Sequence, residues 1–322
     1  MSERETQVDT YQSESLTPEI FAELAPLMMD AFGDSVDSRY FDWKYQENPA
    51  GAATGRIARA DNGEIAAFYG MIPEVVRFGG KPHRIYQSCD TMTHTRHRRR
   101  GLFQRLAKET FAEARAADPN FFAYGFGGPT STPGFLKMGW RIDAEVPNRF
   151  RPFPLTLLPV FGANPGKVQQ LEAPDETLIA SIAEADDQRD GRVERSEAFV
   201  RWRLRNPLRR YSCLVERGVA HAIFYAIPGS VFLFDLWEAS PGAGKNVWDA
   251  LRRTTLSPRG KGLISFAQPG SPFAEMLSRY GFLRNPFGRG PASGGLPLIS
   301  FGDHPPGAPA AWAVSPFDHD SY

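Results

Sequence analysis

THTRHRRRGLFQRL, residues 93–106, is the stretch that decides the predicted fold. Four arginines and two histidines fall within eight residues, and a glycine then opens an apolar run with helical spacing. The preceding segment, PHRIYQSCDTMT, reads as the second strand of a hairpin. The stretch is therefore the point where a strand gives way to a helix, with Gly101 at the helix start.

A helix start of this kind has the chemistry of an anion site. Its first backbone N–H groups have no intrahelical partner, and the helix dipole adds partial positive charge, so a phosphate or pyrophosphate binds there. Gly101 allows close approach of the backbone, and the arginines add charge and bidentate hydrogen bonds. The alternative is a solvated surface cluster, which is common for basic runs.

Length and composition limit the functional classes. A chain of 322 residues suits two domains, and a formal net charge of zero gives no general attraction for nucleic acid or an anionic membrane. Cys89 and Cys213 are too few for a disulfide framework or a cysteine-based zinc site, and they fit a reducing compartment. MSERETQVDT lacks the apolar core of a signal peptide, and no run of about 18 apolar residues occurs. We expect a soluble cytoplasmic protein, with its oligomeric state open.

The first half predicts an α/β (α+β) unit. Residues 1–14 read as a polar lead-in, 17–33 as a helix split at Pro26, and 36–47 as a second helix. Three or four antiparallel strands then lead to the arginine cluster, and the helix after Gly101 runs to Asp118. A short strand at 121–126, a glycine-rich loop and a helical turn complete the unit.

The second half echoes the first. FDWKYQENP (41–49) corresponds to FVRWRLRNP (199–207), with phenylalanine first, a tryptophan within, and Asn-Pro at identical spacing. FLKMGW (135–140) corresponds to MLSRYGF (276–282), which favours duplication of one unit, although chance similarity is the alternative. We therefore predict an N-terminal domain at 1–150, a proline-rich linker at 151–180 and a second, degenerate domain at 181–322.

Arg98 to Phe103, RRRGLF, resembles motif A of the GNAT superfamily of N-acetyltransferases, with Phe103 where that motif has a small residue. The order of predicted elements also resembles tandem GNATs such as the enhanced-intracellular-survival acetyltransferases, with mostly antiparallel central sheets flanked by helices. The loop YGFGGPTSTPGFLKMGW resembles that of bacterial GNATs linked to polysaccharide work. The resemblance implies acetyl-CoA as donor, its pyrophosphate on the loop and its pantetheine arm along one strand. The implied cofactor-binding residues are Thr91, Met92, Thr93, Arg98, Arg99, Arg100, Gly101, Leu102 and Phe103.

The usual catalytic pair of the family is missing. Many GNATs use a Glu and a Tyr at positions that hold Gln87 and Phe135 here, and neither side chain can act as base or acid. Three nearby candidates replace them: Asp90, Tyr124 and His94. Each has another interpretation, since Asp90 can cap a bulge or pair with an arginine, Tyr124 can be core, and His94 can be an ordinary loop histidine. Catalysis by positioning and water needs none of them.

Two motifs of the second half are interpreted as inactive. SPGAGKNVWDAL fails as a P-loop because Ala239 and Asn246 occupy essential positions, and it reads as a degenerate cofactor loop. Asp318, His319 and Asp320 lie in a tail that reads as solvated, so no metal is predicted. The alternative for the tail is a strand that closes the second sheet and ends near the site.

The sequence thus predicts an acetyl-CoA-dependent N-acetyltransferase whose acceptor, a small-molecule or glycan amine, lies between the two units. An amino sugar of a polysaccharide or glycoconjugate, an aminoglycoside and a peptide amine remain open. The enzymatic alternative is aminoacyl transfer of the peptidoglycan-branching type, which uses charged tRNA. A coenzyme-A-binding module without activity is the non-enzymatic alternative. A nucleic-acid role is the weakest, because basic residues are not interleaved with aromatics over a face.

Overall fold

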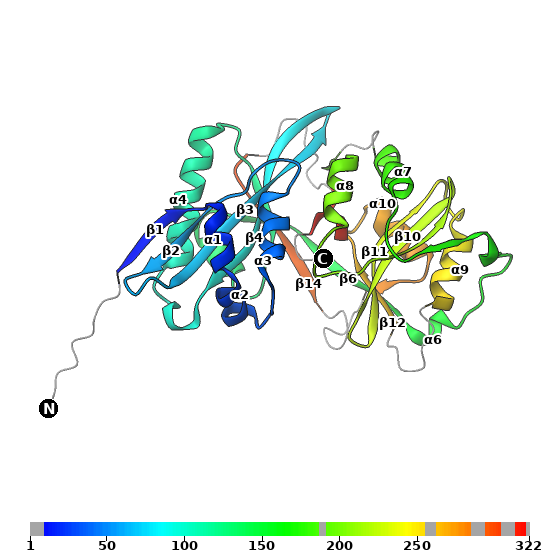
Figure 1. Cartoon of the computed structure of the whole chain (residues 1–322). Coiled ribbons are helices and arrows are strands. Elements are labelled where there is room, and N and C mark those ends of the chain that lie inside the picture. The colour runs from blue at the N-terminus through cyan, green and yellow to red at the C-terminus, as the bar shows by residue number, and fades with distance from the viewer. Residues whose placement is uncertain (1–9, 187–190, 255–261, 285–293, 304–312, 320–322) are drawn as a thin grey trace.

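A computed structural model describes residues 10–186, 191–254, 262–284, 294–303 and 313–319. One sheet of 14 strands runs through the whole molecule in the order β1-β2-β3-β4-β5-β14-β6-β12-β11-β10-β9-β7, with β13 paired to β6 and β8 to β3 (Figure 1). The first unit contains β1 (Tyr11–Ser15), β2 (Thr54–Ala60), β3 (Ile65–Phe78), β4 (Lys81–Thr93), β5 (Ala123–Phe126) and β6 (Arg141–Pro152). The later strands are β7 (Gln169–Leu171), β8 (Arg192–Val193), β9 (Ser212–Glu216), β10 (Ala220–Ile227), β11 (Ser230–Glu238), β12 (Gly262–Phe266), β13 (Leu283–Arg284) and β14 (Gly295–Phe301).

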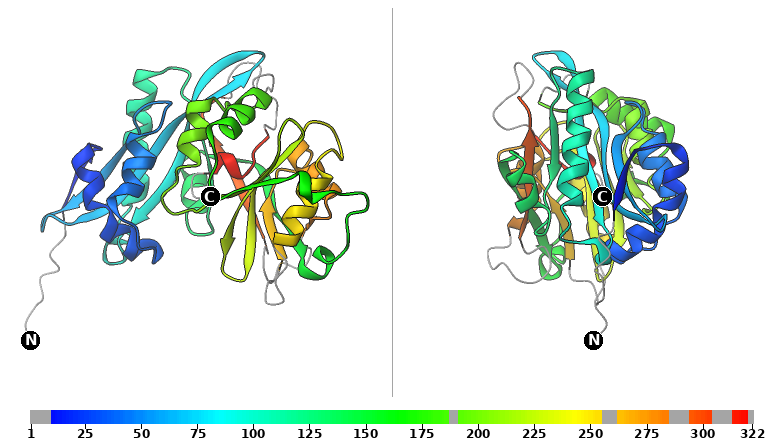
Figure 2. Two further views of the ribbon diagram at one scale, coloured as in Figure 1. Left: turned by 45° about the vertical axis from the view of Figure 1, so that its right-hand side comes forward. Right: turned by 90° about the vertical axis from the view of Figure 1, so that its left-hand side faces the viewer.

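Helices cover both faces of this sheet (Figure 2). Those of the first unit are α1 (Pro18–Glu23), α2 (Ala25–Phe32), α3 (Ser38–Phe41), the π-helix η1 (Asp42–Gln46), the short η2 (Thr95–His97), α4 (Leu102–Ala117) and α5 (Thr132–Lys137). Those that follow are α6 (Phe153–Thr156), η3 (Pro165–Lys167), α7 (Glu176–Asp186), α8 (Glu197–Arg203), α9 (Lys245–Thr254), α10 (Pro272–Arg279) and η4 (Pro316–Asp318). No helix among the described residues is both long enough and apolar enough to cross a membrane.

Strand β3 shows how the sequence distributes its side chains. Successive residues point to opposite faces of a sheet, so alternate positions pack against different helices. Phe68 and Ile72 lie in the core formed with α1 to α3, whereas Tyr69 and Met71 lie in the core formed with α4. All four side chains are buried, because both faces are covered.

The expected elements are largely present, with two corrections at the N-terminus. Leu24 separates α1 from α2, as the proline at position 26 predicts, and the hairpin of β2 and β3 forms as expected. Within the expected lead-in, Tyr11–Ser15 is an edge strand antiparallel to β2. The expected helix at 36–47 is a single α-turn followed by a π-helix, in which the N–H of Glu47 donates to the carbonyl of Asp42 at 3.0 Å.

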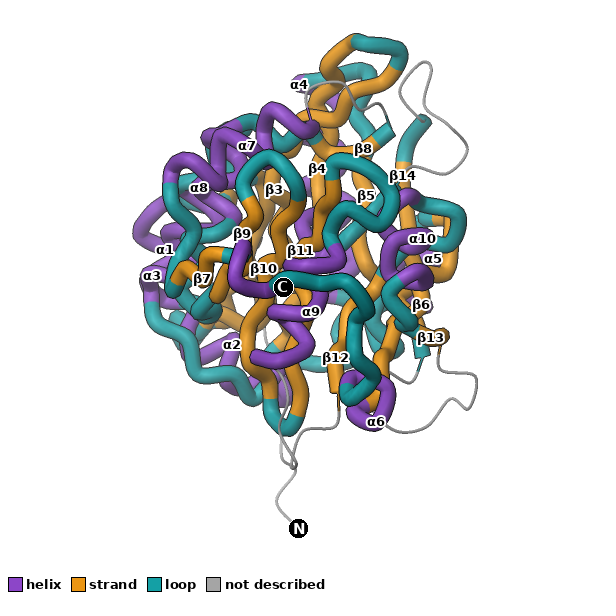
Figure 3. The backbone as a smooth tube through the Cα atoms, turned by 90° about the vertical axis from the view of Figure 1, so that its right-hand side faces the viewer, coloured by secondary structure: helices purple, strands orange, loops and turns teal. Residues whose placement is uncertain are grey.

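The predicted repeat is visible in matched local structure. The side-chain oxygens of Asn48 and Asn206 each accept the N–H two residues later, at 2.9 Å in both cases. Trp140 and Phe282 each donate a backbone N–H to the carbonyl five residues earlier, after a glycine with positive φ. In the second unit α9 takes the place of α4, lying in front of the strands in Figure 3.

The two units share one continuous sheet. Strand β6 pairs with β14 on one side and with β12 on the other, and β14 lies between β5 and β6 in the first half of the sheet. The strand that completes the first unit therefore comes from the end of the chain. The domain limits predicted near 150 and 180 stay a prediction.

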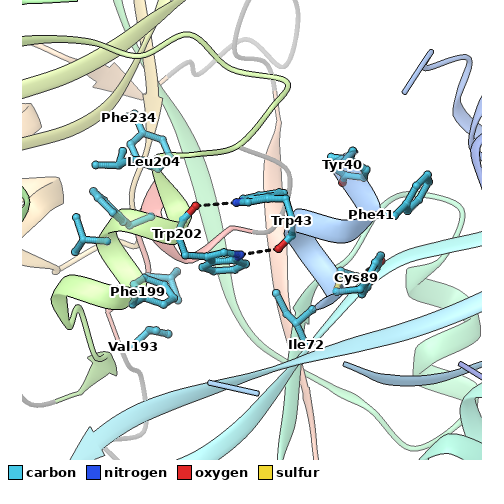
Figure 4. Close-up of a cluster of buried hydrophobic side chains, with 14 of the residues drawn as sticks. Tyr40, Phe41, Trp43, Ile72, Cys89, Val193, Phe199, Trp202, Leu204 and Phe234 are labelled. Atoms are coloured by element: carbon cyan, nitrogen blue, oxygen red, sulfur yellow. Dashed lines mark hydrogen bonds between the residues drawn. The ribbon is translucent and has the colours of Figure 1, made fainter. Parts of the chain in front are cut away.

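Trp43 and Trp202 join the two units at the centre of the shared core (Figure 4). Each indole Nε1–H donates to the other residue's carbonyl, at 2.7 and 2.6 Å, and the rings stack with centroids 5.2 Å apart. Both side chains are buried, so each polar group has its partner inside the core. This reciprocal pairing holds α8 of the second unit in a fixed position against α3 and η1 of the first unit.

Candidate active site

The site lies where β4 and β5 separate. These parallel strands pair only over residues 86–88 and 123–125, and β4 then continues to Thr93 while β5 ends at Phe126. A cavity of about 320 Å³ occupies this wedge. Its walls include residues 88–91 of β4, Gly125 and Phe126 of β5, and Phe135 of α5. Within the described chain, the strand edge at 89–93 that faces β5 has no strand partner, so an extended ligand can pair with it.

A β-bulge sits in the wall of this cavity. Asp90 and Thr91 of β4 together oppose Tyr69 of β3, since Cys89 pairs with Gly70 and Met92 with Phe68. Asp90 has φ 45°, which a non-glycine residue adopts at a cost of about 1–2 kcal/mol. The bulge turns this segment of β4 out of the ladder and into the wedge.

The carboxylate of Asp90 is held by three donors. Lys44 Nζ lies at 2.7 Å, the hydroxyl of Tyr45 at 2.8 Å and that of Tyr40 at 3.2 Å. Lys44 is completely buried, so its charge depends on this partner. Asp90 lines the cavity as the sequence predicts it to, and its contacts favour the alternative in which it stabilises the bulge.

The other two catalytic candidates lie elsewhere. Tyr124 is fully buried, where its hydroxyl donates to Glu74 at 2.6 Å and accepts from Gln87 Nε2 at 2.8 Å. His94 precedes η2 and places Nε2 3.3 Å from Glu64 Oε1 and 3.6 Å from Asp30 Oδ1. Neither residue is among those that line the wedge cavity. The structure thus brings only Asp90 of these candidates to the wedge.

Glu64, His94 and His97 are close enough for a metal ion, with one ligand atom of each lying within 4.8 Å of the others. In the structure the carboxylate of Glu64 already has hydrogen-bond partners. Burial opposes the ionised form of Glu64, but hydrogen bonds from His97 and Arg96 outweigh it and hold its pKa below the usual value. The ring Nδ1 of His94 accepts from the N–H of Arg96, which leaves the proton of a neutral ring on Nε2. The expectation of no metal therefore stays a prediction.

The loop of the opening sequence forms an uncapped helix start. Arg99 and Gly101 have φ 64° and 74°, and α4 begins at Leu102 with no side chain of the described residues capping it. The first N–H groups of α4 therefore remain available to an anion. Arg98, Arg99 and Arg100 are exposed around this loop, and the Arg100 guanidinium lies 5.9 Å from the ring of Tyr11.

Phe103 departs from the small residue of the family motif without closing the loop. Its ring packs edge-on against Phe135, with centroids 4.9 Å apart. A Cβ on Gly134 would lie 2.5 Å from the Phe103 ring, so the glycine leaves the space into which this ring turns. Phe103 therefore adds an apolar contact between α4 and α5.

In the second unit, the loop before α9 corresponds to residues 98–103, and a carboxylate of the protein itself already binds its backbone N–H groups. The carboxylate of Glu238 accepts the N–H groups of Gly242 and Gly244, at 3.0 and 3.1 Å, before α9. Tyr280 donates its hydroxyl to the same oxygen at 2.7 Å, and Arg279 pairs with the other. An internal carboxylate thus binds the N–H groups of this loop, and the degenerate cofactor loop stays a prediction.

The C-terminal tail corrects the expectation of a solvated segment. Asp318 and His319 are 1% and 8% exposed, and the His319 ring stacks on Phe126 at 4.4 Å and lines the wedge cavity. The described part of the tail, residues 313–319, is not a strand, and Ser315 and Asp318 form a capping box around η4. The sequence signal for this was SPFD, with a serine, a proline at the first helical position and an acid three residues on. Asp320 lies outside the described residues.

Comparisons with known proteins agree with this geometry. Residues 13–142 match the family model described as an acetyltransferase (GNAT) domain. A conserved protein of unknown function from Enterococcus faecalis V583, described as a probable N-acyltransferase, is 13% identical with a TM-score of 0.67, over 90% of this chain and 72% of that one. A tandem GNAT protein from the clavulanic acid biosynthesis pathway is 13% identical with a TM-score of 0.58, over 92% and 99%. Eis1 from Mycobacterium abscessus is 13% identical with a TM-score of 0.53, over 79% and 65%. No curated protein matches the sequence.

The family model and the structural neighbours together support an acyltransferase. The N-terminal part of the chain is an acetyltransferase (GNAT) domain, and the whole chain has the fold of tandem GNAT proteins. The resemblance drawn from RRRGLF is confirmed.

Proposed function

We propose that the protein transfers the acetyl group of acetyl-CoA to a primary amine. The observation that carries the proposal is the wedge between β4 and β5, which has an unpaired strand edge on one side and leads towards an uncapped helix start. The strand edge at 91–93 suits the pantetheine arm and the loop at 98–103 suits the diphosphate. The domain at 1–150 would hold the donor, and the part at 181–322, after a linker at 151–180, would complete the acceptor site.

The acceptor side of the cavity receives residues from both units. Tyr40 comes from α3, Arg209 from the loop after α8, and His319 from the tail. An amine entering there would meet the thioester near the bulge of β4. Cys89 and Cys213 are buried and form no disulfide, which fits a reducing compartment such as the cytoplasm as part of this proposal.

We assign His319 as the proton acceptor. In the reaction the amine nitrogen bonds to the carbonyl carbon, the carbon–sulfur bond breaks, the nitrogen loses a proton, and CoA leaves as a thiol. Histidine is the side chain whose ordinary pKa lies nearest neutrality, and this one lines the cavity. Asp90 would act as a positioning residue, because Lys44, Tyr45 and Tyr40 already bind its carboxylate.

Replacing His319 by alanine should lower kcat by about 100-fold or more, the usual contribution of general base catalysis. The pH dependence of kcat should also lose its lower limb, which a merely structural loss would leave in place. The measurement is thiol release from acetyl-CoA with a panel of amines. His83, which lies in the β3–β4 hairpin and does not line the wedge cavity, provides the control substitution by alanine. An unchanged pH profile in the His319→Ala enzyme would exclude this role.

We expect acetyl-CoA to bind once per chain. The Glu238 carboxylate holds the loop N–H groups of the second unit and would repel a diphosphate there, whereas α4 starts uncapped. Calorimetric titration should therefore give a single site. Gly101→Glu should remove all binding, whereas Gly242→Glu should leave the stoichiometry unchanged. A second site, or binding that survives in Gly101→Glu, would contradict this assignment.

A further inference from the structure

A groove in the second unit borders the cavity between β4 and β5. Its volume is about 680 Å³, and its walls come from β6, β10, β11 and β12 together with residues 208–210. Leu208 and Arg209 line this groove and the wedge cavity alike. An acceptor whose amine reaches the bulge of β4 therefore has room for the rest of its structure in this groove.

The groove is cationic. Arg209 and Arg210 both line it, and no carboxylate occurs among its described lining residues. Two carboxylates line the wedge cavity, of which Asp90 is paired with Lys44 and Asp34 is exposed. A polycationic acceptor would meet unfavourable charge along most of this path, whereas an acid group would meet two guanidinium groups.

Arg209 is held in place by its surroundings. Its guanidinium carbon lies 5.2 Å from the ring centroid of Tyr225, and Nη1 donates to the carbonyl of Leu208 at 3.1 Å. The loop itself is fixed by Asn206, whose carbonyl accepts the N–H of Arg209 at 3.1 Å and whose side chain accepts that of Leu208. Such an arrangement loses little freedom when a ligand binds.

We propose that the acceptor carries an acid group, a carboxylate or a phosphate, in addition to its reactive amine, and that Arg209 and Arg210 bind this group. The Tyr225 and Phe232 side chains supply an apolar wall beside them. The inference rests on the proposed acetyl transfer, because it describes the other end of the same substrate. It favours an amino acid or an acidic amino sugar over an aminoglycoside.

Matched pairs of amines test this directly. An ω-amino acid is compared with its methyl ester, and glucosamine 6-phosphate with glucosamine, while kanamycin represents a polycation. We expect kcat/KM for one or both acidic members to exceed that of the neutral partner by about 10- to 100-fold, the usual effect of charge-assisted hydrogen bonds. The two pairs separate a carboxylate from a phosphate.

Variants show which residues create the preference. Arg209→Met and Arg210→Met should each reduce the acidic-to-neutral ratio by about 10-fold, whereas Arg209→Lys, which retains the charge, should keep most of it. Arg205→Met is the control, since Arg205 is exposed and lines neither the groove nor the wedge cavity. The inference is overturned if kcat/KM for the neutral amines or for kanamycin equals or exceeds that for the acidic amines. It is also overturned if the Arg209 and Arg210 variants leave the acidic-to-neutral ratio unchanged.

Calorimetry separates the two proposals. If no amine is acetylated although acetyl-CoA binds, acetyl transfer to these amines fails as a function. In that case the affinities of the same amine pairs for the CoA-loaded protein test the present inference. The acidic amine should bind more tightly than its neutral partner, and the Arg209 and Arg210 variants should reduce this ratio of affinities.

Discussion

Replacing Gly101 by glutamate is expected to abolish the binding of acetyl-CoA. Gly101 has φ 74°, and a Cβ built on it meets no atom within 4 Å, so the new side chain projects into open space beside the start of α4. Its carboxylate would compete with the diphosphate for the same N–H groups and repel it. We expect affinity to fall by at least about 100-fold, equivalent to about 3 kcal/mol.

The control for this variant is Gly79→Glu in the β3–β4 hairpin. Gly79 also has positive φ, 57°, and open space around the built Cβ, so the backbone strain and added charge are comparable. Both variants should unfold at similar temperatures, while only Gly101→Glu loses acetyl-CoA in calorimetry. Equal affinities for the two variants would show that the diphosphate does not bind at this loop.

Removing the Trp43 side chain is expected to destabilise the whole molecule. The indole is 3% exposed and stacks on Trp202, so Trp43→Ala leaves a large cavity and removes one of the hydrogen bonds that the carbonyl of Trp202 accepts, another coming from the N–H of Arg205. Loss of a buried tryptophan usually costs about 3–5 kcal/mol. Because the pair lies between the two units, we expect both to unfold together at lower urea concentration.

Two further variants identify the source of the effect. Trp43→Phe keeps much of the stacking and loses the hydrogen bond to Trp202, so a smaller loss of about 1–3 kcal/mol is expected. Phe161, which is 90% exposed, supplies the control Phe161→Ala, with a change within about 0.5 kcal/mol. If Trp43→Ala behaves like the Phe161 control, the tryptophan pair does not stabilise the interface.

The sequence was a good guide where a local signal matched a local structure. The hairpin of β2 and β3, the helix starting after Gly101 and the division at Pro26 follow from glycine, proline and the apolar period. The repeat was visible too, but the tryptophans are out of register, since Trp43 precedes Asn48 by five residues and Trp202 precedes Asn206 by four. Trp43 lies in the π-helix η1 and Trp202 in the α-helix α8, and the two rings nevertheless stack.

The sequence by itself determined the GNAT class, and it predicted a cofactor loop at 98–103 and the absence of the family's usual catalytic pair, because each depends on residues that are near one another in the chain. The tertiary structure decided which side chains share the cavity. His319 and Arg209 come from segments more than 100 residues beyond the bulge at Asp90, and only the shared sheet and the tryptophan pair bring them to it. The tertiary structure also determined that Tyr124 donates a hydrogen bond to Glu74 and that Glu238 accepts the N–H of Gly242 in the loop before α9. Periodicity along the chain carries no information about such partners.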